Sequence, residues 1–179
     1  MKLLRTIRLD ASDRFVFDEA AEPGEWAVSG AFAFWAANPA TLEGKARAAF
    51  RSGFLGVNSL GRSTLAQIVE ASESERAELV GALAKQLVRR FGAPDLEAAN
   101  AAAEDEINFV ESLCTQPQDT LIAVHRSYED GALRERFRTL RPRQGAKPAR
   151  AFSFFSVEGD DQAAPEHVDL ISLAEPERK

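Results

Sequence analysis

The sequence contains one motif with the residue types and spacing of a ligand-binding loop. Gly56, Gly61, Arg62 and Ser63 match the phosphate-loop pattern, with Arg62 where that pattern has lysine. Such a loop holds phosphates with backbone N–H groups, while its lysine reaches the phosphates and its hydroxyl binds magnesium. The pattern requires a buried strand before the loop and a long helix after it. We therefore need the neighbouring segments to interpret it.

Those neighbouring segments have the opposite character. Residues 43–51 before the motif look helical, and residues 64–71 after it look like a strand. Arginine is also a poor substitute for the compact lysine ammonium group. We interpret residues 53–63 as a glycine-rich turn. The alternative is a small enzyme or a nucleotide or phosphate binder that uses this loop, in which His125 could take part.

A basic segment is the clearest electrostatic feature of the chain. The whole sequence has a net charge of −6, yet residues 126–150 hold many more basic than acidic side chains. The three acids are Glu129, Asp130 and Glu135, and the eight basic residues are Arg126, Arg134, Arg136, Arg138, Arg141, Arg143, Lys147 and Arg150.

Alternation along the predicted strand 133–140 places its arginines on one face. Arg134, Arg136 and Arg138 stand in a row with spacings of roughly 7 Å, and guanidinium groups suit carboxylates and phosphates. The pattern predicts an anion-binding or acidic-partner site. The other reading is a charged face that protects an edge strand from aggregation. The candidate site residues are Arg126, Arg134, Arg136, Arg138 and Arg141.

Partners are predicted from the same charge pattern. Acidic stretches at 97–111 and 158–177 could neutralise the arginines within the chain or across a homodimer. A separate acidic protein is the other candidate partner. The acidic overall balance disfavours binding to nucleic acid or to anionic membranes, because each phosphate contact requires a lysine or arginine.

Catalytic and metal chemistry have little support. The two histidines and one cysteine cannot form a Cys/His metal cluster. Glu104, Asn108 and Glu111 share a helix face but lack the Glu-x-x-His pair of carboxylate-bridged metal sites, so we interpret that face as solvated and acidic. Cys114 lies on an apolar helix line and is predicted to be a core residue. We therefore identify no catalytic residues from the sequence, and we predict no metal and no cofactor.

Length and composition indicate one domain. The chain has 179 residues, 45% of them hydrophobic and 28% charged, which is ordinary globular usage. A single cysteine fits a reducing compartment. Charges interrupt the first residues too often for a signal peptide, and the longest uncharged apolar stretch, 26–37, is shorter than the roughly 20 residues of a membrane span. We expect a cytoplasmic protein.

The periodicity predicts an α+β fold with a mostly antiparallel sheet of about five to seven strands, packed against a helical pair and one short helix. Strands are predicted at 2–9, 26–35, 121–126, 133–140 and 150–157, with a possible short strand at 15–17 and a strand or short helix at 64–71. The strand at 26–35 is expected in the middle of the sheet, because neither of its faces carries charge. The predicted domain is 1–157, followed by an acidic segment at 158–179.

The helical pair is specified by its caps. Ser72 and Glu75 form a capping-box pattern, and Gly92 follows the last apolar position of the first helix. Pro94 and Asp95 begin a second helix that continues to about Cys114. Since the link is short, the two helices should be antiparallel or steeply crossed neighbours. A shorter helix, capped by Asn38 or Thr41, should end near residue 51.

Several segments resemble a known bacterial family. They are the opening residues 1–10, the run 15–17, the stretch 22–32 with its Pro-Gly-Glu-Trp sequence, and the short glycine-containing segments 54–56 and 61–63. The chain resembles, to about residue 157, a bacterial family catalogued only as a domain of unknown function. The resemblance implies membership and says nothing about chemistry, because no catalytic residues are established for that family. We expect a non-enzymatic accessory or interaction protein that uses the basic hairpin.

Overall fold

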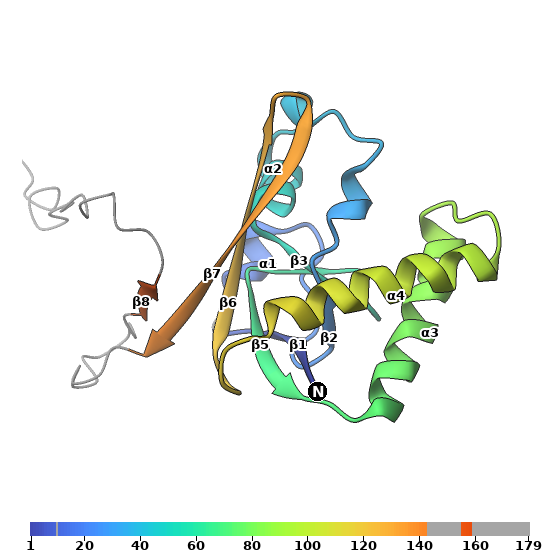
Figure 1. The fold of residues 1–179 in the computed structure, drawn as a ribbon. Coiled ribbons are helices and arrows are strands. Elements are labelled where there is room, and N and C mark those ends of the chain that lie inside the picture. The colour runs from blue at the N-terminus through green and yellow to red at the C-terminus, as the bar shows by residue number, and fades with distance from the viewer. Residues whose placement is uncertain (10, 143–154, 159–179) are drawn as a thin grey trace, which may run out of the picture.

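The computed structural model describes residues 1–9, 11–142 and 155–158, with the backbone alone for 141, 142 and 155–158. Its described strands form one eight-stranded sheet with the order β4-β3-β2-β1-β5-β6-β7-β8 (Figure 1), and each pair of neighbours is antiparallel. The strands are β1 Lys2–Ile7, β2 Trp26–Val28, β3 Phe54–Gly56, β4 Arg62–Ser63, β5 Leu65–Glu70, β6 Leu121–Glu129, β7 Ala132–Pro142 and β8 Phe155–Glu158.

The described part of the chain also contains α-helices and short 3₁₀ turns. They are α1 Asp13–Val16, α2 Gly44–Ser52, α3 Glu73–Arg90 and α4 Leu96–Leu113, with 3₁₀ turns η1 Ala31–Phe34 and η2 Pro39–Thr41. The predicted α+β class with an antiparallel sheet and a helical pair is confirmed. Among the described residues, no helix is both long enough and apolar enough to cross a lipid bilayer.

The helical pair forms as its caps predict. The Ser72 hydroxyl accepts from the Glu75 N–H at 3.2 Å, and the Glu75 carboxylate accepts from the Ser72 N–H at 2.9 Å. Asp95 caps α4 by accepting from the Ala98 N–H at 2.8 Å. The two helices contact each other, and α4 also contacts β1 and β2 (Figure 1).

The core is formed by α3, α4 and the sheet. Apolar residues of α4 at helical spacing have 0% exposure, as do both leucines near the start of β1. These residues are Ala99, Ala103, Ile107, Val110, Leu3 and Leu4. Cys114 joins the same cluster. Burial raises the pKa of its thiol to about 12, which keeps it protonated and unreactive at neutral pH.

Two sequence-based assignments are wrong near the N-terminus. The possible strand at 15–17 is the end of the short helix α1. The strand predicted over 26–35 ends at Val28, because Gly30 has a φ of +69° and breaks the extended backbone. A Cβ atom at Gly30 would lie 2.4 Å from the Leu55 Cβ, so the chain needs glycine there to turn close to β3. The following apolar residues form η1 instead.

The middle of the chain needs one correction. The predicted glycine-rich turn over 53–63 includes two short strands, β3 and β4, which pair with each other, and β3 also pairs with β2. Residues 65–70 form the strand β5, so the alternative of a short helix at 64–71 is wrong. Pairing with the whole length of β1 fixes this strand, since Leu4 stands opposite Ile68 and both are fully buried.

The C-terminal hairpin is the longest strand pair. Asp130 and Gly131 have φ values of +52° and +77°, as a two-residue type I′ turn requires. They join β6 to β7 in a register that runs from Glu129 opposite Ala132 to Leu121 opposite Leu140. The backbone of β8 then pairs with the end of β7. The rest of the predicted strand 150–157 and the acidic segment after 158 lie outside the described residues.

Candidate functional site

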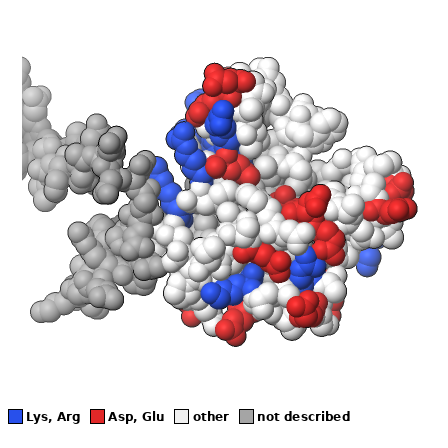
Figure 2. Space-filling view, viewed as in Figure 1, with Lys and Arg blue, Asp and Glu red and all other residues white. Residues whose placement is uncertain are grey.

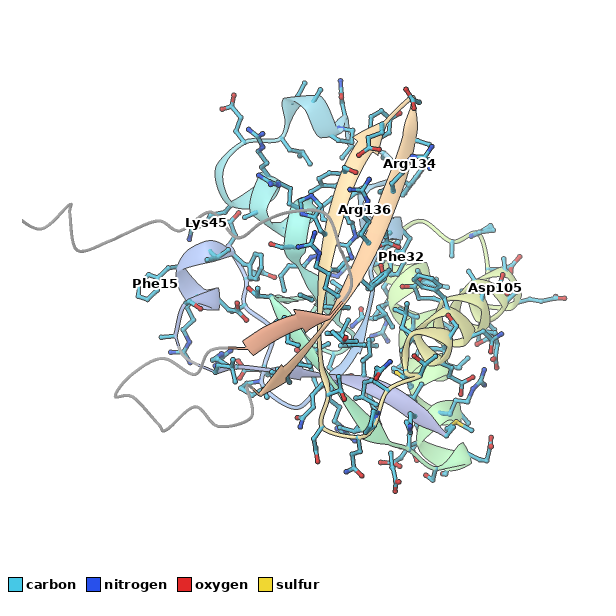
Figure 3. The ribbon with its side chains drawn as sticks, turned by 60° about the vertical axis from the view of Figure 1, so that its left-hand side comes forward. Phe15, Phe32, Lys45, Asp105, Arg134 and Arg136 are labelled. Atoms are coloured by element: carbon cyan, nitrogen blue, oxygen red, sulfur yellow. The ribbon has the colours of Figure 1, made fainter. Side chains whose placement is uncertain are left out.

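Alternation along β7 sorts its side chains as the sequence predicts. Arg134, Arg136 and Arg138 are exposed, whereas the residues between them, including Glu135 and Phe137, are half-buried. Figure 3 shows the labelled Arg134 and Arg136 along the hairpin. The pairing places His125 opposite Arg136 on the same exposed face. We call the surface formed by His125, Arg134, Arg136 and Arg138 the arginine surface.

The arginine surface is only weakly neutralised. Among the described residues, the ion pairs of Arg134 and Arg136 are with Glu129 alone, at 3.8 Å in both cases, and Arg138 has none. The side chains of Arg134 and Arg136 are 55% and 63% exposed, so these contacts contribute little. In Figure 2 a group of lysine and arginine atoms lies at the upper left, with acidic atoms above and below it.

The pKa of His125 reports the same excess of positive charge. Partial desolvation lowers this pKa below the ordinary 6.5, and the charges of Arg51, Arg138 and Arg136 lower it further. Arg51 belongs to α2, which contacts β6. A bound anion would offset these charges and make protonation of His125 easier.

Arg126 does not belong to this surface, contrary to the prediction. Its side chain lies on the opposite face of the hairpin and is 1% exposed. Its Nε lies 2.7 Å from Oε1 of Glu135, which is its cross-strand neighbour. The remaining guanidinium hydrogens go to the Phe50 carbonyl at 3.1 Å, the Gly53 carbonyl at 2.9 Å, and the carbonyl and hydroxyl of Ser29.

This buried cluster ties the hairpin to the body of the molecule. Glu135 also accepts from the Ser29 hydroxyl, so the residue after β2, the end of α2 and the hairpin meet at one guanidinium. Such a network needs all its members, since an unpaired buried charge is strongly destabilising. We infer that Arg126 holds the hairpin in the orientation that presents the arginine surface.

Two further charged groups adjoin the cluster. Burial raises the pKa of Glu106, whose carboxylate accepts from the Gly30 N–H at 3.0 Å. Burial, and then repulsion from Arg126, lowers the pKa of Arg62 to about 9. The Arg62 guanidinium donates to the Gly53 carbonyl at 3.3 Å and stacks 4.6 Å from the centre of the Phe34 ring.

The structure shows what holds the glycine-rich loop. The carboxylate of Glu25 accepts from the N–H groups of Asn58 and Ser59 at 3.0 and 2.9 Å, and from the Ser59 hydroxyl at 2.5 Å. A Cβ at Gly56 would lie 2.3 Å from the same carboxylate. The chain's own anion therefore occupies the loop amides that would face a phosphate.

The other members of the motif also have structural partners. A Cβ at Gly61 would lie 2.6 Å from the backbone of Ala20, so glycine allows a close approach of two chain segments. The Ser63 hydroxyl donates to the carbonyls of Ile7 and Leu65 at 3.2 and 2.8 Å. The motif does not gather its side chains around a common point. Phosphate binding by Gly56, Gly61, Arg62 and Ser63 stays a prediction that would require Glu25 to move.

The acidic face of α4 is partly neutralised by a residue of the neighbouring helix. Arg76 of α3 lies 2.7 Å from the Glu104 carboxylate, 2.7 Å from the Asn108 amide oxygen and 3.4 Å from the Glu111 carboxylate. These contacts give the acids a structural partner. Within the described part of the chain, no group of three His, Cys, Asp or Glu side chains could hold a metal ion.

Comparison with known protein families identifies the family of this chain. A family model described as "Family of unknown function (DUF6505)" matches residues 1–159, which is most of the chain. Comparisons with curated proteins and with solved structures give no significant match. The match includes all the elements described above, from β1 to β8. The chain therefore belongs to the DUF6505 family, a family of unknown function.

Proposed function

We propose that this chain is a non-enzymatic accessory or interaction protein whose arginine surface holds an acidic protein segment or another anionic group. The observation that carries the proposal is the row of Arg134, Arg136 and Arg138, exposed on one strand with Glu129 as its weakly placed counter-charge. Guanidinium groups bind carboxylates through paired hydrogen bonds, and a row of them favours a ligand with several charges.

The surroundings of the row support the same reading. The His125 imidazole adds a group that can become positive when an anion approaches. The buried pair of Arg126 and Glu135 fixes the strands beneath it, so the arginines project from a braced hairpin. Preorganisation of this kind reduces the entropy lost on binding.

A titration with a labelled acidic peptide tests the proposal. The probe is a short fluorescein-labelled peptide that alternates glutamate and threonine, and anisotropy measures its binding to the full chain at low ionic strength. The test variant is R134E/R136E/R138E. The control is K85E/R89E/R90E, which makes the same charge change at exposed residues of α3.

We expect the hairpin variant to weaken binding at least about tenfold, because three attractive contacts become repulsive. The control variant should change it far less, and added salt should weaken binding to the wild type. Equal losses in both variants would show that overall charge governs binding, and no binding to the wild type would remove the proposal.

A further inference from the structure

The edge of β7 is open beside the arginine surface. β7 runs over 11 residues and pairs with β6 from Ala132 to Leu140. On its other side, the backbone of β8 pairs only with residues 139–142. Within the described part of the chain, residues 132–138 therefore present a strand edge without a partner strand. An unpaired edge is a template for adding another extended chain.

The turn determines which backbone groups point outward at this edge. In a two-residue hairpin the residues that flank the turn, Glu129 and Ala132, form a hydrogen-bonded pair. Hydrogen-bonded pairs then recur at every second position, so Arg134, Arg136 and Arg138 direct their backbone groups toward β6. Leu133, Glu135 and Phe137 direct theirs toward the open side.

An added strand would therefore meet the arginines at favourable positions. Opposite an incoming antiparallel strand, Arg134, Arg136 and Arg138 occupy the pairs without hydrogen bonds, where facing side chains are closest. Their repeat of roughly 7 Å equals the repeat of alternate residues in an extended chain. A segment with acids at alternate positions could place one carboxylate beside each guanidinium.

The half-buried face of β7 determines which residues an added segment should have between its acids. Leu133 and Phe137 are half-buried on that side, and the Phe137 ring lies against Phe54 and Phe109 with centroid distances of 6.3 and 5.6 Å. Intervening residues of an added segment would lie next to these apolar side chains. β-branched residues suit such half-buried strand positions.

We propose that the open edge of β7 binds an extended acidic segment of a partner protein by strand addition, with acids alternating with β-branched residues. This inference rests on the proposed function and specifies its ligand: backbone hydrogen bonds at residues 133, 135 and 137 hold the segment, and the arginines select its charge. A compact anion would engage the row less completely, because the row extends along the strand.

Three peptides of equal charge test this mode of binding on the full chain. The first alternates glutamate and threonine. The second has the same composition with its glutamates in one block. The third is the first peptide with N-methyl groups at alternate residues, which removes N–H donors from the edge it would present and leaves every carboxylate in place. Anisotropy titrations compare their dissociation constants at one ionic strength.

Strand addition predicts that the alternating peptide binds tightest. The N-methylated peptide should bind about tenfold more weakly, as expected for losing two or three net hydrogen bonds. The blocked peptide should also bind more weakly. Equal binding of all three would overturn strand addition and leave the proposed function standing. Binding of none of them would overturn both.

Two other outcomes would assign the edge to a different occupant. Self-association of the wild-type chain that the alternating peptide reverses would place a second copy there. Binding that appears only after Asp160→Asn and Asp161→Asn are introduced would place this chain's own acidic segment there. Either result would contradict a separate partner protein.

Discussion

Arg126 and Arg134 belong to the same hairpin and have opposite surroundings. Arg126 is buried among carbonyl groups and bonded to Glu135, whereas Arg134 is mainly exposed to solvent. A buried ion pair has a structural role because each partner depends on the other. An exposed arginine contributes little to stability and remains available for a ligand. Burial therefore distinguishes a structural arginine from an arginine that is available to a ligand, although both belong to the same basic segment.

Removing Arg126 should destabilise the fold far more than removing an exposed arginine. Arg126→Met removes the ion-pair partner of the Glu135 carboxylate and the guanidinium donor of three carbonyl groups, so the free energy of unfolding should fall by about 3–5 kcal/mol. Arg134→Met should change it by no more than about 0.5 kcal/mol. Urea unfolding measures both values.

A double variant separates the effect of losing the Arg126–Glu135 ion pair from the effect of leaving the Glu135 carboxylate without its partner. R126M/E135L removes both ends of the pair, and it should be more stable than Arg126→Met alone, since no buried carboxylate remains unpaired. If Arg126→Met unfolds at the wild-type urea concentration, the cluster does not brace the hairpin.

The imidazole of His125 should titrate below the ordinary range. Partial desolvation and then three arginine charges disfavour its protonated form in the folded state. As pH falls through the unfolded value of 6.5, the unfolded chain takes up the proton first, so the stability contributed by this group is lost as pH falls. Nuclear magnetic resonance of the ring protons gives the midpoint directly.

An acidic peptide should raise the His125 midpoint, because its carboxylates offset the charges of Arg51, Arg136 and Arg138. The same titration on R134E/R136E/R138E should begin from a higher midpoint and respond less to the peptide. A His125 midpoint that the peptide leaves unchanged in the wild type would place the ligand elsewhere.

At the scale of elements, the hairpin turn sets the register of the arginine surface. Asp130 and Gly131 both have positive φ, and the register counted from them pairs Arg126 with Glu135. A shift of one residue would move the arginines to the buried face. The turn residues therefore determine which charges are buried and which are exposed.

Two glycine substitutions should have opposite effects on stability. Gly131 has a φ of +77° and free space around it, so Gly131→Ala should cost about 1 kcal/mol from backbone conformation alone. Gly81 lies inside α3 with nothing near a Cβ atom, and Gly81→Ala should stabilise by about 0.5–1 kcal/mol. Thermal unfolding compares them with the wild type, and a stabilising Gly131→Ala would contradict the turn conformation.

Some elements were predictable because their signals are local. The capping residues Ser72 and Asp95 and the Asp130-Gly131 turn determine nearby backbone geometry, and the structure has helices and a hairpin there. The strand predicted at 26–35 is correct only as far as Val28, because its end depends on distant contacts. Its break at Gly30 follows from the approach of Leu55, which the local pattern does not contain.

The candidate site was only partly predictable from the sequence, because part of it depends on contacts that form in the complete fold. Alternation along β7 gave the exposed arginine row correctly, since period two is a property of any strand. The burial of Arg126 depends on carbonyl groups of residues 29, 50 and 53, which only the complete fold assembles. Its partner Glu135 could have been found by counting the register back from the Asp130-Gly131 turn.

At the scale of the whole molecule, acidic and basic side chains differ in how well they are paired within the chain. Glu104 and Glu111 of α4 contact Arg76, and Glu25 holds the glycine-rich loop. Among the described residues, Arg134 and Arg136 of β7 have Glu129 as their one acidic partner, and Arg138 has no ion pair. The molecule is acidic overall, yet it presents a basic strand beside an open edge. This contrast is the basis for our proposal that the hairpin binds a ligand.

Mapping the bound peptide onto the full chain tests this assignment most directly. Amide chemical shifts of the ¹⁵N-labelled protein are recorded while the alternating glutamate–threonine peptide is added. We predict the largest changes at residues 132–138 and at His125, with little change in the loop held by Glu25 or on α3. Changes centred on that loop or on α3, with the hairpin unaffected, would contradict the account.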